Sequence, residues 1–221
     1  MCFKTLNTII EESDNMVFLG GAGVYTESNI LDFRSQNGLY NLKTDLNYPP
    51  EVILSNSFFI NHTEDFFKFY KSNIIFTNVF PNKAHFILTK LEKANKLTAI
   101  ITQNIDGFHQ IAGSKNVYEL HGSIHRNYCM NCNKFFNLDY ILNSKTIIPR
   151  CNNCGGVVKP DVVLYEENLH MDILEHSINA ISIADTLIVG GTSLVVYPAA
   201  NLLKFFKGNK LCIYKLCIYK R

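Results

Sequence analysis

Two pairs of cysteines in the second half of the chain have the spacing of a metal site. Two residues separate Cys129 from Cys132, eighteen residues follow, and Cys151 and Cys154 repeat the short spacing. Each pair places two thiolates on one tight turn, and two such turns supply the ligands of a tetrahedral zinc ion. Four protein ligands leave no open position, so we expect a structural zinc module. Free or disulfide-bonded cysteines are the alternative, which a cytoplasmic protein disfavours.

A glycine-rich turn follows a short apolar run, residues 16–19, which is typical of a buried strand. Gly20, Gly21 and Gly23 would let backbone N–H groups approach a phosphate, because no side chain blocks them. The turn does not complete the G-x-G-x-x-G pattern, so a purely structural turn is the alternative. Further on, the guanidinium group of Arg34 in the segment 32–34 is able to hold a phosphate or a bound ring. The alternative is that this segment is a solvated loop.

Polar side chains also follow a second apolar run, residues 97–102. The amide groups of Gln103 and Asn104 and the carboxylate of Asp106 suit hydrogen bonds to ribose hydroxyls and to a carboxamide. His121, between Leu120 and Gly122, is a candidate general base because histidine titrates near neutral pH. A lone histidine is more often a structural residue, and this alternative stays open on its own context.

The elements that must position these groups alternate along the chain. Apolar runs at 97–102, 157–164, 186–189 and 210–214 have strand character, and helical patterns cover 84–94 and 171–184. This alternation favours an α/β fold, a Rossmann-like doubly wound parallel sheet with helices on both faces. Residues 20–23, 103–106 and 190–193 each follow a strand candidate. We expect these three loops to converge on one crevice, where such sheets bind nucleotides.

Two segments interrupt this pattern. Residues 55–80 are rich in phenylalanine and predict a helical cap segment, and residues 125–156 hold the zinc-binding module. We assign the large Rossmann-like domain to residues 1–54, 81–124 and 157–221. The chain ends in a tandem copy of five residues, 211–215 and 216–220, which indicates an altered or truncated C-terminus.

Composition narrows the possible partners. The formal net charge is +2 and no long run of Lys and Arg occurs, so nucleic acid is an unexpected partner. No apolar segment reaches the roughly 20 residues that span a bilayer, and the N-terminus lacks a signal-peptide pattern. We expect a cytoplasmic protein without membrane contact.

Together the segments resemble the sirtuin family of NAD-dependent protein deacylases, in its bacterial form, over residues 18–208. The likeness makes residues 1–221 a single sirtuin-type catalytic domain. The motifs that carry it, in chain order, are Gly21-Ala22-Gly23, Thr26-Glu27-Ser28, Asp32-Phe33-Arg34-Ser35, Thr102-Gln103-Asn104-Ile105-Asp106-Gly107, Leu120-His121-Gly122, both cysteine pairs, Lys159-Pro160-Asp161-Val162-Val163 and Gly191-Thr192-Ser193-Leu194.

The resemblance implies a lysine deacetylase that consumes NAD and carries one structural zinc ion. The acyl oxygen of an acylated protein lysine attacks the ribose carbon that bears nicotinamide, and nicotinamide leaves. His121 then takes a proton from a ribose hydroxyl, which attacks the imidate-like adduct, and water finally releases lysine and O-acyl-ADP-ribose. Asn104 would help to hold the reacting ribose and the water.

The resemblance also assigns binding residues. The backbone of the substrate would pair, as an added strand, with Val162, Val163, Leu164 and Tyr165. Acidic acyl groups would need an arginine in the acyl channel, and none occurs between Arg34 and Arg126, so acetyl is the expected group. The cofactor site would comprise Gly21, Ala22, Gly23, Thr26, Phe33, Arg34, Gln103, Asn104, Ile105, Asp106, His121, Gly191, Thr192 and Ser193.

Some positions depart from the family pattern. Tyr25 stands where a small hydroxyl residue is usual and would crowd the phosphates, and Leu31 replaces a proline. These changes, with the unusual C-terminus, leave two alternatives open. One is a catalytically impaired NAD-binding relative, and the other is a protein ADP-ribosyltransferase.

Overall fold

The computed structural model describes residues 2–28, 30, 38–41, 46–195 and 197–214. Its larger sheet is parallel and has the strand order β3-β2-β1-β7-β8. The strands are β1 (Met16–Gly20), β2 (Leu97–Thr102), β3 (Val117–Glu119), β7 (Thr186–Gly190) and β8 (Lys210–Tyr214). The chain runs outward from β1 to β3, then returns to β7 on the other side of β1. The predicted doubly wound sheet is therefore confirmed, with its switch point between β1 and β7.

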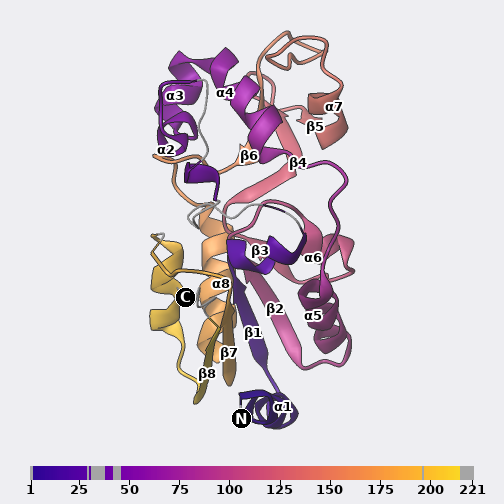
Figure 1. The fold of residues 1–221 in the computed structure, drawn as a ribbon, viewed down its shortest axis with the longest axis vertical. Coiled ribbons are helices and arrows are strands. Elements are labelled where there is room, and N and C mark those ends of the chain that lie inside the picture. Colours follow the sequence, from indigo (N-terminus) through magenta and orange to yellow (C-terminus); the bar gives the residue numbers. More distant parts are fainter. Residues whose placement is uncertain (1, 29, 31–37, 42–45, 196, 215–221) are drawn as a thin grey trace.

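Helices cover both faces of this sheet (Figure 1). Side chains of β1 point alternately to two cores, because successive residues of a strand face opposite sides. Leu19 packs with residues of α8 (Met171–Ile183) and of the 3-10 helix η5 (Ala199–Phe205), whereas Phe18 packs with residues of α5 (Lys83–Lys93). Every residue of β1 is buried, as expected for the central strand of such a fold.

The second sheet is antiparallel, with the order β5-β4-β6. It comprises β4 (Gly122–Cys129), β5 (Phe135–Phe136) and β6 (Val158–Val162). Helix α7 (Leu138–Leu142) packs against β4. The sequence grouped residues 157–164 with the strands of the parallel sheet, whereas β6 pairs with β4. The apolar run alone does not reveal its partner. The division of the chain into large domain, cap segment and zinc module stays a prediction.

The cap segment is helical, and its helices lie beside the second sheet (Figure 1). They are α3 (Asn56–Asn61), α4 (Thr63–Phe69) and the π-helix η4 (Tyr70–Ile74), and α2 (Pro50–Ile53) lies just before the segment. Their aromatic side chains share one buried cluster with residues of β4, β6 and α7. The phenylalanine-rich segment thus supplies the core on which the second sheet rests. The aromatic residues are Phe58, Phe59, Phe66, Phe67, Phe69 and Tyr70.

Short helices complete the structure. They are α1 (Cys2–Glu11), α6 (Phe108–Ile111) and the 3-10 helices η1 (Ala22–Val24), η2 (Thr26–Ser28) and η3 (Leu39–Asn41). Among the residues that the structure describes, no helix combines the length and apolar character needed to cross a bilayer.

Gly122 allows β4 to approach β6 closely. Its φ angle is 75°, and a Cβ atom there would lie 1.8 Å from the carbonyl oxygen of Asp161. Any side chain at position 122, the residue that follows His121, would therefore overlap with the backbone of β6. Gly155 has the same φ of 75°, but a Cβ atom there would have nothing within 4 Å.

This pair of glycines separates backbone strain from steric overlap. We predict that Gly155→Ala lowers the free energy of unfolding by about 1–2 kcal/mol, the cost of a left-handed conformation. Gly122→Ala adds the overlap with Asp161 and should lower it by about 3 kcal/mol or more. Urea unfolding of the zinc-loaded protein measures both values. Equal losses would contradict the close approach of β4 to β6.

Candidate functional site

The loops after β1 and β7 interlock through their glycines. The Gly21 N–H donates to the Gly190 carbonyl (3.1 Å) and the Gly23 N–H donates to the Gly191 carbonyl (2.7 Å). A Cβ atom at Gly23 would lie 2.7 Å from the Gly191 Cα. Glycine is therefore needed at these positions because the two loops pack closely, which is not the reason expected from the sequence. Their N–H groups bind the neighbouring loop, and contact of Ala22 and Thr26 with a phosphate stays a prediction.

The loop after β2 contacts the loops after β1 and β7. The Gln103 N–H donates to the Gly20 carbonyl (3.0 Å), and Gln103 Nε2 donates to Thr192 Oγ1 (3.1 Å). The buried Asn104 donates from Nδ2 to the Gly21 carbonyl (3.2 Å). The predicted convergence of three loops at the carboxyl ends of the strands is confirmed.

Asp106 is a buried carboxyl group in the loop after β2. Its Oδ1 accepts the N–H of Phe108 at the start of α6 (2.8 Å). Its Oδ2 is also buried and has no hydrogen-bond partner among the described residues. Burial is the main reason that the pKa of Asp106 rises to about 6. An unpartnered carboxylate oxygen of this kind fits a ligand that brings an N–H donor, such as a carboxamide.

His121 lies in the turn from β3 to β4. Its Nδ1 is 2.8 Å from the carbonyl oxygen of Gln103. Because a carbonyl only accepts, Nδ1 carries the proton and Nε2 keeps its lone pair. Burial lowers the pKa of His121, and the bond to Gln103 opposes this in part. The imidazole is therefore neutral at neutral pH and able to take up a proton.

The predicted substrate segment is tied to the histidine. The Val163 N–H donates to the backbone carbonyl of His121 (3.0 Å). The Leu164 N–H donates to Glu167 Oε2 (2.8 Å), and the Tyr165 N–H donates to a carbonyl in the turn before α3 (3.0 Å). Three N–H groups of the segment are thus in use. Most carbonyl oxygens of the segment are in use as well, since Leu164 accepts the N–H of Glu167 (3.1 Å), Tyr165 accepts the N–H of Asn56 (2.9 Å) and Val162 accepts from a lysine. Pairing of an added peptide strand with this segment stays a prediction.

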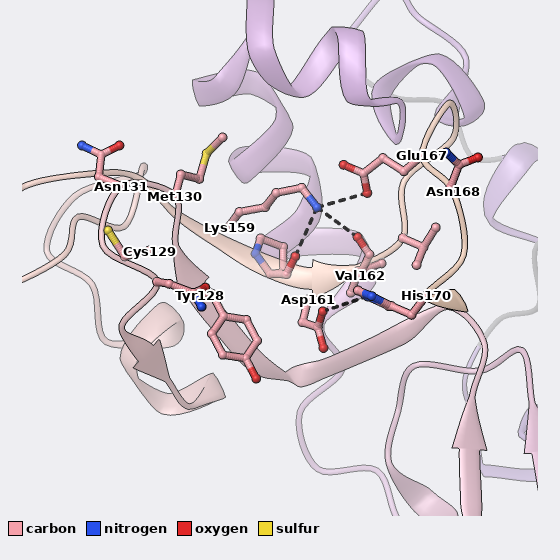
Figure 2. Close-up of a pocket in the computed structure, with 13 residues that line it drawn as sticks. Tyr128, Cys129, Met130, Asn131, Lys159, Asp161, Val162, Glu167, Asn168 and His170 are labelled. Carbon is pink, nitrogen blue, oxygen red and sulfur yellow. Dashed lines mark hydrogen bonds and ion pairs between the residues drawn. The ribbon is translucent and has the colours of Figure 1, made fainter. Parts of the chain in front are cut away.

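A cavity of about 560 Å³ borders this segment on the side of the second sheet (Figure 2). Lys159 Nζ contacts Glu167 Oε2 (3.2 Å) and the Val162 carbonyl (3.2 Å), and His170 Nε2 lies 3.4 Å from Asp161 Oδ1. In this cavity Lys159 is therefore paired with Glu167, and His170 contacts Asp161. Of the predicted substrate residues, only Val162 and Val163 line it.

The four cysteines of the second sheet form one cluster. Their sulfur atoms all lie within 4.8 Å of one another. The Sγ atoms of Cys129 and Cys154 are 3.4 Å apart, and those of Cys132 and Cys151 are 3.7 Å apart. A zinc–sulfur bond of about 2.3 Å gives a tetrahedron with edges of about 3.8 Å, so the cluster fits the predicted zinc ion. Backbone N–H groups lower the pKa of Cys129 and Cys132, which favours the thiolates that bind metal.

The remaining predicted residues have mixed outcomes. Phe33, Arg34 and Leu31 lie outside the described residues. The side chain of Tyr25 is buried in a cluster with Ile30 and Phe108, so much of its bulk is accommodated within the protein. The last predicted cofactor residues occupy two loops already described. Ile105 lies in the loop after β2, and Ser193 follows Gly191 and Thr192 in the loop after β7.

Sequence reasoning missed two residues of β4. His125 Nε2 donates to the Asp106 carbonyl (2.9 Å) and so supports the loop that carries this carboxylate. Arg126 pairs with both Glu119 (2.6 Å) and Asp161 (2.8 Å). No sequence motif predicts these contacts, because they depend on an irregularity in the pairing of β4 with β6.

The zinc cluster predicts a metal-dependent fold. We expect the purified protein to hold one zinc ion per chain and Cys151→Ser to lose it. Unfolding stability should fall by about 3 kcal/mol or more, because metal binding is coupled to folding. Metal analysis and thermal unfolding measure both effects. Cys212→Ser, outside the cluster, is the matched control, and full zinc content in Cys151→Ser would contradict the assignment.

The raised pKa of Asp106 predicts a pH-dependent stability. A folded-state pKa of about 6, above the ordinary 3.8, means that the folded state binds the proton more tightly than the unfolded state. The ionised carboxyl therefore destabilises the fold increasingly as pH rises from about 4 to 6 and fully above that. Asp106→Asn should then gain stability over the wild type at pH 8 relative to pH 5, by about 1.4 kcal/mol. A pH-independent difference would contradict this environment.

Comparisons with known proteins show the family of the chain. The model of the Sir2 family matches residues 21–198. An NAD-dependent protein deacetylase of Clostridium acetobutylicum is 65% identical over 208 residues, which cover 94% of this chain and 85% of that protein. A solved Sir2 variant with deacetylated p53 peptide and 3′-O-acetyl ADP ribose has a TM-score of 0.88 and 40% identity, covering 97% of this chain and 87% of that chain.

A second structure, Sir2 with p53 peptide and NAD⁺, has a TM-score of 0.84 and 40% identity over 96% of this chain and 86% of that one. The predicted resemblance is confirmed by these matches, since the family model spans most of the chain. On these matches the chain belongs to the Sir2 family.

Proposed function

We propose that this protein removes acetyl groups from protein lysines and transfers them to the ADP-ribose part of NAD, with release of nicotinamide. The observation that carries this proposal is the placement of His121. Its side chain is held by the loop after β2, and its backbone carbonyl binds Val163 of the proposed substrate segment. The relatives named as NAD-dependent deacetylases and the structures with acetylated or deacetylated peptides support the same reaction.

The described residues fit NAD. The buried, unpartnered Oδ2 of Asp106 is suited to the carboxamide of nicotinamide, and Ile105 is proposed to lie beside that ring. Thr192, Ser193 and the glycine loop are proposed to line the rest of the dinucleotide. When bound, NAD supplies a ribose carbon from which nicotinamide can leave and to which the acyl oxygen attaches.

His121 acts as the general base in this proposal. Its neutral Nε2 takes the proton of a ribose hydroxyl, and the carbonyl of Gln103 stabilises the resulting positive charge through Nδ1. The lowered pKa of His121 keeps the imidazole unprotonated at neutral pH, ready for this step. Asn104, held by the Gly21 carbonyl, is proposed to orient the ribose and the attacking water.

The acetylated peptide is proposed to lie along Val162, Val163, Leu164 and Tyr165. Three N–H groups of this segment donate within the chain, and three of its four carbonyl oxygens accept within the chain, so main-chain recognition is proposed to use the carbonyl oxygen of Val163. Such recognition depends little on the side chains of the peptide. The four cysteines hold zinc through thiolates, which stabilises the second sheet beside this segment and supplies no open coordination position.

We predict that an acetyl-lysine peptide loses its acetyl mass only when NAD is present. His121→Ala should lower kcat by about 100-fold or more, because proton transfer to a positioned base contributes about this much. Mass spectrometry of peptide and nucleotide products measures the reaction. His176→Ala is the control, since this exposed histidine lies on α8 and stacks on Tyr118 outside the crevice.

The products also separate the alternatives. O-acetyl-ADP-ribose and a bare lysine support the deacetylase. A peptide that gains the mass of ADP-ribose would favour a protein ADP-ribosyltransferase. An unchanged peptide, in zinc-loaded folded protein that binds NAD, would favour a catalytically impaired relative.

A further inference from the structure

Strand β4 contains an irregularity directly after the histidine turn. In the register of β4 with β6, Ser123 pairs with Asp161 and Asn127 pairs with Pro160. The residues of β4 between these pairs, 124–126, are therefore skipped by the ladder. Irregularities of this kind bend a strand and redirect side chains that would otherwise alternate between its faces.

The redirected Arg126 connects the two sheets. Its Nη1 donates to Glu119 Oε2 (2.6 Å) and its Nε donates to Asp161 Oδ2 (2.8 Å). Glu119 is the last residue of β3, two positions before His121. Asp161 lies in β6, one position before the proposed substrate residue Val162. One guanidinium group thus ties the strand that leads to the base to the strand that leads to the substrate segment.

We propose that Arg126 is a positioning residue for deacetylation, which holds the His121 turn and the substrate segment in a fixed relation by bridging Glu119 and Asp161. This inference rests on the proposed function, because it assumes the roles given to His121 and to the substrate segment. Arginine suits this place, since its rigid planar group donates in two directions at once.

The charges around this bridge extend its effect to Asp106. The Glu119 side chain is only 7% exposed, so its carboxylate needs the guanidinium partner. Burial is the largest cause that raises the pKa of Asp106, and the charge of Glu119 raises it further. The hydrogen bond from Phe108 and the charge of His125 lower it. On the other side, Asp161 pairs with His170 as well as with Arg126 (Figure 2 shows the contact with His170).

Loss of Arg126 therefore has a predictable electrostatic consequence. The buried Glu119 loses its partner, and its full negative charge acts on Asp106. The pKa of Asp106 should rise, so that the carboxylate needed for the nicotinamide carboxamide is lost at a higher pH. A second change that removes the charge of Glu119 should cancel this effect, although it does not rebuild the bridge.

The test compares Arg126→Met, Glu119→Gln and the double variant Arg126→Met/Glu119→Gln in zinc-loaded protein. Carboxyl-carbon NMR follows the titration of Asp106 without turnover, and deacetylation of an acetyl-lysine peptide gives kcat/KM as a function of pH. Arg126→Met should move the Asp106 titration and the acid limb of the profile upward by about half a pH unit or more. It should also lower kcat/KM for the peptide about tenfold.

The double variant distinguishes this proposal from a merely structural role. Its Asp106 titration and acid limb should return toward the wild-type positions, while kcat/KM stays lowered because the bridge is absent. Arg126→Lys, which keeps the charge, should leave the titration near the wild type. Lys90→Met, an exposed change on α5, should alter neither readout.

Two results would overturn the proposal. One is an unchanged titration of Asp106 and unchanged kcat/KM in Arg126→Met, and the other is a double variant whose titration stays as displaced as that of the single variant. Failure of the proposed function would look different. Wild-type protein would then leave the peptide acetylated at every pH, while the NMR titrations of Asp106 could still be compared.

Discussion

The proposed site depends on one hydrogen bond, from His121 Nδ1 to the carbonyl oxygen of Gln103. It decides which nitrogen of the imidazole carries the proton, and so which one is available as a base. The same contact joins the turn after β3 to the loop after β2, the loop that also carries Asn104 and Asp106. The position of the base is thus coupled to the groups that are proposed to bind ribose and nicotinamide. A free histidine at this place would have neither a defined tautomer nor a fixed orientation.

The backbone that makes this bond possible is held by close packing. The loop after β1 lies on the loop after β7 because Gly21, Gly23 and Gly191 leave no side chain between them. Gly122 then lets β4 begin against the backbone of Asp161, so that the second sheet starts one residue after the base. The aromatic cluster of the cap helices supports that sheet from one side, and the four cysteines hold its far end. The three loops and the proposed substrate segment are therefore adjoining parts of one framework.

Much of this framework was accessible from the sequence. Residues 97–102 and 210–214 form strands with the predicted bounds, because apolar runs next to turn residues are typical of central strands. The cysteine spacing indicated the cluster, since two short pairs have few other uses. The pairing of strands that lie far apart in the chain could not be predicted from the sequence. The apolar run that includes Val158 fits either sheet, and only its contact with β4 decides between them. The roles of His125 and Arg126 depend on the irregular register of β4, which leaves no trace in local residue patterns.

The most direct test of the central claim is ¹⁵N NMR of the His121 ring in the zinc-loaded protein at pH 7.5, assigned by comparison with His121→Ala. We predict a neutral imidazole with the proton on Nδ1 and an unprotonated Nε2. The reverse tautomer, or a protonated ring at this pH, would rule out His121 as the base, because Nε2 would then have no lone pair with which to accept the ribose proton.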